Sequence, residues 1–325
     1  MAHATSGHVP LCSIVMPVRN GERFLEASLE SVLSQSVTDF ELIVIDNASV
    51  DATPKVLTRY TCDARIKVIT NPLDKGIAWS RNVGLNLAST GLIVNLDADD
   101  LMAPHRLERQ LEYMEANPTI AGAGTFYYII NESGEICGKQ KSPLTSLTQL
   151  NRYIDGGGNP IFPNPAMIFR KSAAISVGGF REEYEKCEDV DLFLRMILAG
   201  HVIIIQPEYL TYYRVHSSST TARNGRKQFE LNEILFTNFR RKRAGLAEIS
   251  ASEFREKIAR LSLLGRLARE AKFLSRRLLR RRDMARLRNR RFYAALLLSA
   301  AAVCDPGTTI MKMKRQLAQG ISVRL

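Results

Sequence analysis

Short apolar runs alternate with amphipathic segments in the first third of the chain. Mainly apolar runs at 12–16, 40–45, 66–69 and 92–96 have the length and composition of buried strands. The segments 21–33, 51–60, 76–88 and 104–116 instead repeat apolar residues at helical spacing. Apolar strands that alternate with helices are typical of a mostly parallel sheet with helices on both faces. The pattern predicts an α/β, Rossmann-like fold.

The remaining chain continues this pattern and then changes in charge. Further strands are predicted at 124–130, 166–170, 202–205 and 209–215, and a helix at 187–198. Residues 1–225 carry 20 Lys and Arg against 25 Asp and Glu, a net charge of −5, whereas residues 226–325 carry 25 against 8, a net charge of +17. We therefore predict an α/β domain over residues 10–225 and a basic helical region over residues 226–325.

Three predicted strands end in segments suited to a ligand. The first ends at Pro17 and Val18, the second at Asp46, and the fourth at Asp97 and Asp99. Parallel strands joined by right-handed crossovers end at one edge of the sheet, where ligands usually bind. Clustered carboxylates repel one another, and Mg²⁺ or Mn²⁺ bound by oxygen ligands relieves this repulsion and bridges to phosphates. The pattern indicates a metal and phosphate site, and the alternative is that these acids only cap the next helix.

Residues 12–216 resemble the family 2 glycosyltransferases, inverting enzymes of the GT-A fold. The matching segments follow the family's order: SIVMPVRN (13–20), SVLSQS (31–36), ELIVIDNAS (41–49), NP (71–72), GIAWSRN (76–82), DADD (97–100), NPAM (164–167), GGF (178–180) and EDVDL (188–192). The resemblance implies a GT-A catalytic domain over residues 10–225. It also implies a nucleotide-sugar donor, expected to be a UDP-sugar, a Mn²⁺ or Mg²⁺ ion, and transfer with inversion to a saccharide or lipid-linked acceptor.

The resemblance also implies roles at matching positions on the donor side. Asp99 is expected to bind the metal, and Asp97 to contact the sugar or ribose of the donor. Asp46 is expected to contact the nucleotide, and Arg81 to be the cation near the donor. The nucleotide loop beside Asp46 contributes Pro17, Val18 and Asn20.

Inversion by a single displacement needs one base that takes the proton from the acceptor hydroxyl. The resemblance implies Asp189 as this base, with Glu188 or Asp191 in support. From the residues alone, acids at 188–191 would equally stabilise the start of a helix. His216 follows a Tyr-Arg pair and is expected to be a further contact to the metal or diphosphate. The loop at 217–227 could then close over bound donor.

Composition restricts the compartment and the class of protein. At 45% hydrophobic and 24% charged residues, the chain has an ordinary globular composition. Its five scattered cysteines form no C-x-x-C pair, which argues against a disulfide framework and a zinc site. Residues 1–9 lack a signal-peptide pattern, and no apolar run reaches the length of a spanning helix. We expect a cytoplasmic protein, peripheral on the inner face of the membrane.

The basic region carries no readable catalytic motif. Leucines alternate with arginines over 261–282, and an apolar run follows at 292–304. A basic amphipathic helix beside an apolar run suits an anionic membrane surface, and we predict such a contact through residues 261–304. The alternative is a helical bundle whose arginines are merely solvated. Nucleic-acid binding is not expected, because basic residues are not interleaved with aromatic ones.

Two other functions are weighed against sugar transfer. A nucleotidyltransferase that makes nucleotide-sugars also uses paired acids on a nucleotide-binding fold. That class needs a glycine-rich basic loop after the first strand, whereas this chain offers only Arg19 and Gly21 there. A non-catalytic scaffold that binds glycans or membranes is the other alternative, and the intact acids Asp97, Asp99 and Asp189 argue against it.

Overall fold

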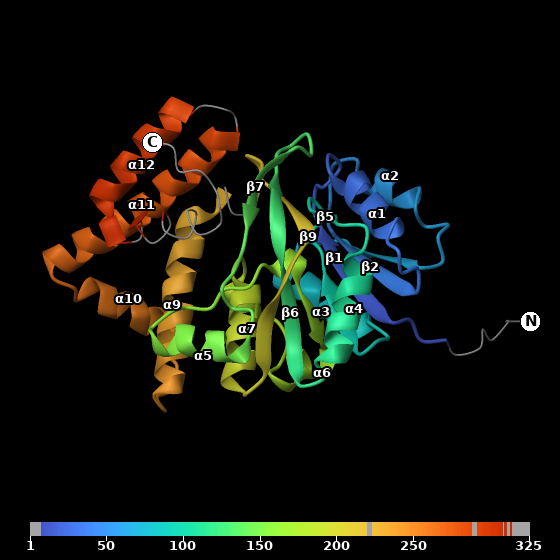
Figure 1. Ribbon diagram of the computed structural model, residues 1–325, viewed down its shortest axis with the longest axis horizontal. Coiled ribbons are helices and arrows are strands. Elements are labelled where there is room, and N and C mark those ends of the chain that lie inside the picture. The colour runs from blue at the N-terminus through green and yellow to red at the C-terminus, as the bar shows by residue number, and fades with distance from the viewer. Residues whose placement is uncertain (1–7, 220–222, 288–290, 308, 311–312, 314–325) are drawn as a thin grey trace, which may run out of the picture. The chain divides into compact units, whose positions relative to one another are not determined.

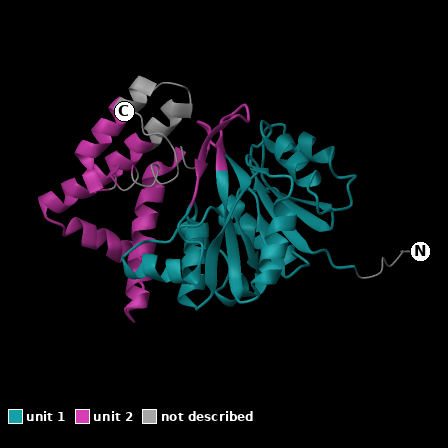
Figure 2. Ribbon diagram, viewed as in Figure 1, with its two compact units in different colours: residues 1–127, 142–213 teal, residues 128–141, 214–325 magenta. Residues whose placement is uncertain are grey.

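The computed structural model describes residues 8–219, 223–287, 291–307, 309–310 and 313. The chain forms two compact units, and each is described by itself below. The first unit comprises residues 1–127 and 142–213, and the second comprises residues 128–141 and 214–325 (Figure 2). The predicted boundary at residue 225, between the catalytic domain and the basic region, stays a prediction.

The first four strands and helices of the first unit lie where the apolar pattern predicts them (Figure 1). The strands pair in parallel in the order β3-β2-β1-β4, and they are β1 (Cys12–Val18), β2 (Phe40–Asn47), β3 (Ile66–Asn71) and β4 (Leu92–Asn95). The helices are α1 (Leu25–Leu33), α2 (Thr53–Thr58), α3 (Ile77–Leu87) and α4 (Arg106–Ala116). The carboxyl ends of these strands therefore share one edge.

Beyond β4 the sheet becomes mixed, and its order continues as β4-β8-β6-β9-β5, with β5 (Leu101–Met102), β6 (Ile120–Ile130), β8 (Ile168–Arg170) and β9 (Val202–Arg214). The short strand β8 runs antiparallel to both β4 and β6. Strand β6 therefore runs in the same direction as β1 to β4, and the predicted mostly parallel sheet is interrupted by β8. The strands predicted at 202–205 and 209–215 form the single strand β9. The two-residue β5 pairs with Thr211 and Tyr212 of β9.

Three further helices and two 3₁₀ turns complete the first unit. The helices are α5 (Leu147–Asp155), α6 (Lys171–Ser176) and α7 (Glu188–Leu198), and the turns are η1 (Asn164–Ala166) and η2 (Glu182–Tyr184). Helix α7 corresponds to the predicted helix at 187–198. Helices α5 and α6 were not predicted, although Leu147, Leu150 and Ile154 of α5 lie at helical spacing. Helix α6 has only six residues, too few for a periodic pattern.

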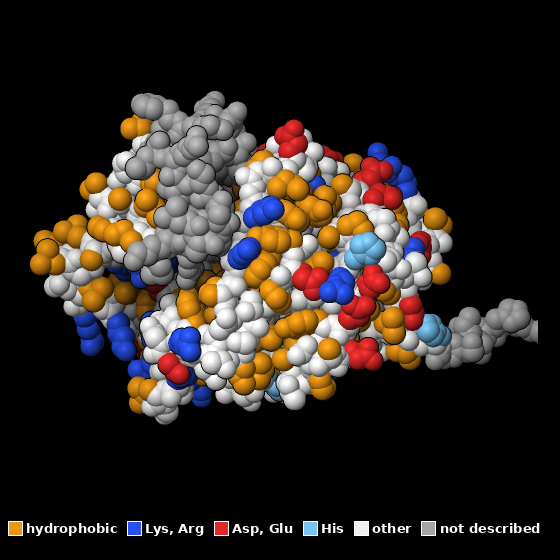
Figure 3. Space-filling view, in the orientation of Figure 1, with side chains coloured by type: hydrophobic (Ala, Val, Ile, Leu, Met, Phe, Trp, Pro, Cys, Tyr) orange, Lys and Arg blue, Asp and Glu red, His pale blue; other side chains and the backbone are white. Residues whose placement is uncertain are grey.

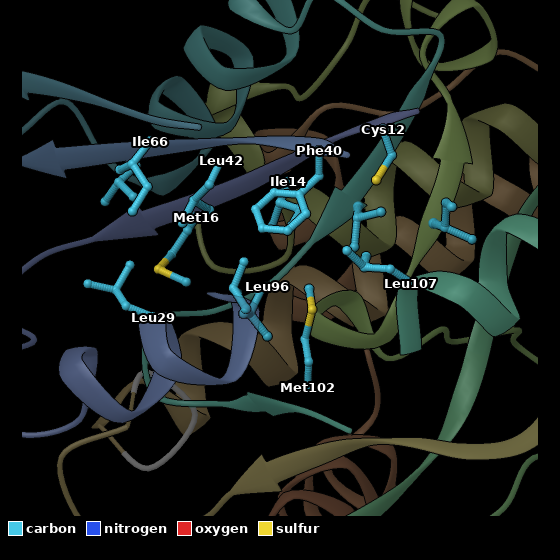
Figure 4. Close-up of a cluster of buried hydrophobic side chains, with 14 of the residues drawn as sticks. Cys12, Ile14, Met16, Leu29, Phe40, Leu42, Ile66, Leu96, Met102 and Leu107 are labelled. Atoms are coloured by element: carbon cyan, nitrogen blue, oxygen red, sulfur yellow. The ribbon is translucent and has the colours of Figure 1, made fainter. Parts of the chain in front are cut away.

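Helices cover both faces of the parallel strands. On one face, Ile14, Met16 and Leu42 pack with Leu29 of α1 and Leu107 of α4 (Figure 4). On the opposite face, α3 approaches β1 and β2 through Gly84. A Cβ atom at this glycine would lie 2.3 Å from Val15 Cγ1 and 3.1 Å from Ile45 Cδ1. On the same face, Phe193 of α7 stacks edge-to-face on Phe169 of β8. This second face brings the starts of α3 and α7 toward the strand ends.

The second unit is largely helical. It contains the strand β7 (Ile136–Gln140), which pairs with β6, and the helices α9 (Gly225–Arg243), α10 (Ala251–Ala259), α11 (Leu263–Leu287) and α12 (Arg291–Cys304). Leu279 of α11 is buried with Leu298 and Ala301 of α12. Among the described residues, none of the helices combines the length and apolarity that crossing a bilayer requires.

Candidate active site

The loops after β1 and β2 are joined at the carboxyl edge of the sheet. Val18 pairs with Asp46 in the parallel register. The Asp46 carboxylate accepts a hydrogen bond of 3.1 Å from Ser49 N, and Asn20 N donates to Ser49 Oγ at 2.8 Å. Asn20 adopts φ +53°, and its Oδ1 accepts from Val50 N at 2.9 Å. The proposed nucleotide residues Pro17, Val18, Asn20 and Asp46 thus lie together, while their contact with a nucleotide stays a prediction.

Arg81 joins the other predicted residues into one cluster. Its Nη2 donates to Asp97 Oδ1 at 3.0 Å, and its Nη1 donates to Glu188 Oε1. The side chains of Arg81 and Glu188 are 5% and 3% exposed, whereas that of Asp97 is 30% exposed. Residues from α3, from the end of β4 and from the start of α7 therefore meet at this guanidinium. Asp97 is the member that solvent or a ligand can reach.

The segment before α7 fixes the start of α3. Glu185 accepts hydrogen bonds from Ile77 N at 3.0 Å and Ala78 N at 3.1 Å, so its carboxylate caps α3. Gly76 has φ +86°, and a Cβ atom there would lie 2.8 Å from Glu185 Oε2. Lys186 also has φ +86°, and its N–H donates to Glu188 Oε2 at 2.8 Å. Glu185 was missed from the sequence because its partners are 107 and 108 residues away.

A second group of polar residues, which are buried, lies next to Asp97. Asn95 Nδ2 donates to Asn164 Oδ1 at 2.7 Å, and Asn164 Nδ2 lies 3.5 Å from Asp97 Oδ1. Arg106 is fully buried and donates to Pro165 O at 2.6 Å and Asn95 O at 3.0 Å. Arg106 therefore ties the end of β4 to the turn that carries Asn164. The NPAM motif was the sequence signal for Asn164, whereas nothing pointed to Arg106.

One guanidinium faces three carboxylates in this cluster. Burial alone would lower the pKa of Arg81, but Glu188, Asp97 and Asp189 raise it, so Arg81 stays charged. Burial raises the pKa of Glu188 to about 7, although the ion pair with Arg81 offsets part of the rise. Burial also raises the pKa values of Asp97 and Asp189, again opposed by Arg81. The site is thus short of positive charge and holds carboxylates more basic than usual.

Asp191 has a different environment from Asp189. It is buried, and its carboxylate is bound by the guanidinium groups of Arg181 and Arg195, the latter through Nε at 2.8 Å. Both of its oxygens are used within α7 and the segment before it. Asp191 therefore stabilises the position of α7 through buried ion pairs. Its expected role in support of the base Asp189 stays a prediction.

The predicted metal residues are Asp99 and His216. Within the described part of the chain, no group of three or more His, Cys, Asp or Glu side chains could hold a metal ion by itself. Asp99 nevertheless lies near enough to Asp97 to raise its pKa. Mg²⁺ and Mn²⁺ are commonly held by one or two carboxylates together with substrate phosphates. The Asp97 and Asp99 pair fits an ion of this kind, whose remaining ligands come with a diphosphate.

His216 belongs to the second compact unit. Its imidazole is buried, and Nδ1 shares a hydrogen bond of 2.7 Å with Ser218 Oγ. Its assignment as a metal or diphosphate contact stays a prediction. In the first unit, Tyr213 was also missed: it stacks with Tyr127 at 5.5 Å, and burial together with Asp100 and Asp99 raises the pKa of its hydroxyl.

Comparison with known proteins finds one matching family profile and several similar sequences. The profile of the family described as "Glycosyl transferase family 2" matches residues 13–178. The O-antigen biosynthesis glycosyltransferase WbnJ of Escherichia coli is 30% identical over 214 residues, which are 65% of this chain and 82% of WbnJ. The UDP-Glc:α-D-GlcNAc-diphosphoundecaprenol β-1,3-glucosyltransferase WfgD of E. coli is 39% identical over 133 residues, which are 41% of this chain and 51% of WfgD.

A solved structure shares the fold. The mannosyltransferase PcManGT of Pyrobaculum calidifontis, solved in complex with GDP-Man and Mn²⁺, superposes with a TM-score of 0.54. The alignment covers 97% of this chain and 82% of that protein at 19% sequence identity. The predicted α/β fold of the GT-A class, with additional C-terminal helices, is therefore confirmed.

Proposed function

The chain belongs to glycosyl transferase family 2, and from this premise we propose the reaction that its site performs. A sugar passes from a nucleotide-diphosphate donor to a hydroxyl of a saccharide or lipid-linked acceptor, with inversion at the anomeric carbon. The observation that carries the proposal is Arg81, which binds Asp97 at the end of β4 and Glu188 at the start of α7. It joins a donor-side acid to an acceptor-side acid within one buried cluster.

The donor is proposed to be a UDP-sugar bound along the carboxyl edge of β1, β2 and β4. The name of WfgD specifies a UDP-glucose donor, which supports uridine, whereas PcManGT was solved with GDP-Man. Asp46 and the backbone of Pro17 and Val18 lie at this edge, as does Asn20. These residues are assigned to the nucleoside. Asp97 is assigned to the donor sugar or ribose, because it is the exposed member of the Arg81 cluster.

Asp99 is proposed to hold the metal, with Asp97 beside it. When bound, Mn²⁺ or Mg²⁺ would neutralise the negative charge that develops on the leaving diphosphate. His216 is kept as a further contact to the metal or diphosphate. The charge of Arg81 is already balanced by its ion pairs with Asp97 and Glu188, so it brings no excess positive charge to the diphosphate.

Asp189 is proposed as the base that accepts the proton of the acceptor hydroxyl. Burial raises its pKa, which makes its carboxylate a better proton acceptor near neutral pH. Glu188 suits a supporting role better, because Arg81 and Lys186 N engage both of its oxygens. Proton transfer to Asp189 as the acceptor oxygen attacks from the side opposite the diphosphate would give inversion.

The acceptor is proposed to belong to surface polysaccharide assembly. WbnJ is named for O-antigen biosynthesis, and the name of WfgD specifies an acceptor linked to diphosphoundecaprenol. A lipid-linked acceptor would place the enzyme at the inner face of the membrane. Family membership favours sugar transfer over the nucleotidyltransferase alternative. Measured sugar transfer would exclude the alternative of a non-catalytic scaffold.

The test compares Asp189→Asn with a matched substitution, Asp63→Asn. Asp63 pairs with Arg65 in the loop before β3, at the opposite edge of the strands. Asp189→Asn should lower kcat by about 10²–10⁴-fold, the usual contribution of a positioned base. Calorimetry with UDP and Mn²⁺ should find unchanged nucleotide binding in both variants. Transfer at the wild-type rate in Asp189→Asn would place the base elsewhere.

A further inference from the structure

Four leucines of α11 form an exposed apolar ridge. Leu263, Leu267 and Leu274 are spaced by four and seven residues, so they lie along one face of the helix. Leu264 lies beside them. Their exposed fractions are 65%, 56% and 43% for the first three and 78% for Leu264. In Figure 3, apolar side chains gather where α10 leads into α11. Single exposed leucines are ordinary, but several of them on one face of a helix mark an interaction surface.

The helical packing of the second unit does not use this ridge. Toward α9, α11 presents Phe273, which packs on Phe229 with ring centroids 5.4 Å apart. Toward α12, it presents Leu278 and Leu279, which pack with apolar residues that include Leu298. Part of the apolar run at 292–304, which was predicted to contact the membrane, is thus buried between α11 and α12. Among the described residues, the leucine ridge stays outside this helix packing.

Basic residues flank the ridge. Arg266 and Arg277 are eleven residues apart, so they lie along one side of it. Both are exposed. Residues 251–279 carry eight Lys and Arg against three Glu, a net charge of +5. Of those acids, Glu270 is already bound by Arg226 of α9 at 2.6 Å and 2.7 Å. An exposed apolar row bordered by cations has the character of an interfacial helix.

We propose that the leucine ridge of α11 docks on an anionic lipid surface. The leucines enter the boundary between headgroups and acyl chains, while Arg266 and Arg277 contact lipid phosphates. Charge selects this partner over a second copy of the chain, because residues 251–279 carry a net charge of +5 and two such surfaces would repel. This inference rests on the proposed function, because binding to a membrane would bring the enzyme to a lipid-linked acceptor.

Vesicle flotation of the full chain tests the proposal. The wild type should float with vesicles of phosphatidylcholine that contain phosphatidylglycerol, and much less with phosphatidylcholine alone. Leu263→Asp combined with Leu267→Asp should weaken this binding at least about tenfold, because burying each leucine contributes on the order of 1.5–3 kcal/mol. The matched control is Leu73→Asp, an equally exposed leucine of the first unit, which should float like the wild type.

A second variant tests the charge separately. Arg266→Glu combined with Arg277→Glu should lose the preference for phosphatidylglycerol while all leucines remain. The proposal is overturned if the leucine variant floats like the wild type, if neutral vesicles bind equally well, or if the ridge instead mediates a dimer that both variants dissociate. Transfer to a soluble acceptor is measured in the same preparations and should be unchanged. If the wild type binds vesicles but transfers no sugar, the result would count against the proposed function and not against membrane binding.

Discussion

At the scale of single residues, Arg81 controls the charge of the site. Its guanidinium opposes the burial that raises the pKa values of Asp97, Glu188 and Asp189. A base is active only when deprotonated, so transfer should fall as the pH drops through these raised pKa values. Because the acids interact, the fall reports the cluster and not one carboxyl group. We therefore predict that Arg81 sets the lowest pH at which transfer is efficient.

Substituting Arg81 should separate its charge from its geometry. In Arg81→Met the carboxylates lose their cation, and the acidic limb of kcat/KM should move to higher pH by about 1–3 units. In Arg81→Lys the charge remains but the planar fork is lost, so kcat should fall while the limb stays near its wild-type position. Rate profiles over the acidic and neutral range check both variants. An unmoved limb in Arg81→Met would mean that Arg81 does not set the protonation of the base.

At the scale of elements, the placement of Arg81 depends on how closely α3 lies on the sheet. Gly84 is one turn after Arg81 and faces Val15 of β1 and Ile45 of β2. There is no space for a methyl group at this position, since its Cβ atom would lie 2.3 Å from Val15 Cγ1. Any side chain must therefore push α3 outward, and Arg81 moves with it.

Gly84→Ala should lower the free energy of unfolding by about 1–3 kcal/mol through overpacking. It should also lower kcat/KM, because the Arg81 contacts with Asp97 and Glu188 lengthen. Gly91→Ala is the matched control: no atom lies within 4 Å of its Cβ position, so stability and kcat/KM should change little. Urea denaturation and initial rates provide both readouts. Equal effects of the two substitutions would contradict the close contact of α3 with β1.

The same scale separates what the sequence could predict from what it could not. The first four strands and helices follow from local periodicity, and the motif order identified Arg81, Asp97 and Asp189. Strand pairing beyond β4 depends on partners distant in sequence, so the single strand β9 was predicted as two strands on either side of Pro207. The short helices α5 and α6 were also missed. Glu185 and Arg106 act through backbone groups of other segments, which no local pattern encodes.

At the scale of the whole molecule, the charge of the chain is divided between its two parts. The region before residue 226 has a net charge of −5, and under the proposed function the acids at its strand ends face a diphosphate that is itself negative. The region after it has a net charge of +17, and its basic residues beside the leucine ridge of α11 are proposed to contact lipid. A divalent ion is the natural means to join Asp97 and Asp99 to a nucleotide diphosphate. Binding of metal and nucleotide should therefore be mutually dependent.

This dependence should be visible in thermal unfolding. UDP with Mn²⁺ at about 100 times Kd should stabilise the chain by about 2.7 kcal/mol and raise the Tm of the first unit's transition. UDP alone or Mn²⁺ alone should have much smaller effects, since each leaves negative charges facing one another. Asp99→Asn should abolish the added effect of Mn²⁺, whereas Asp63→Asn should keep it. An equal rise in Tm with and without Mn²⁺ would mean that the donor diphosphate binds without a metal, and that Asp99 has another role.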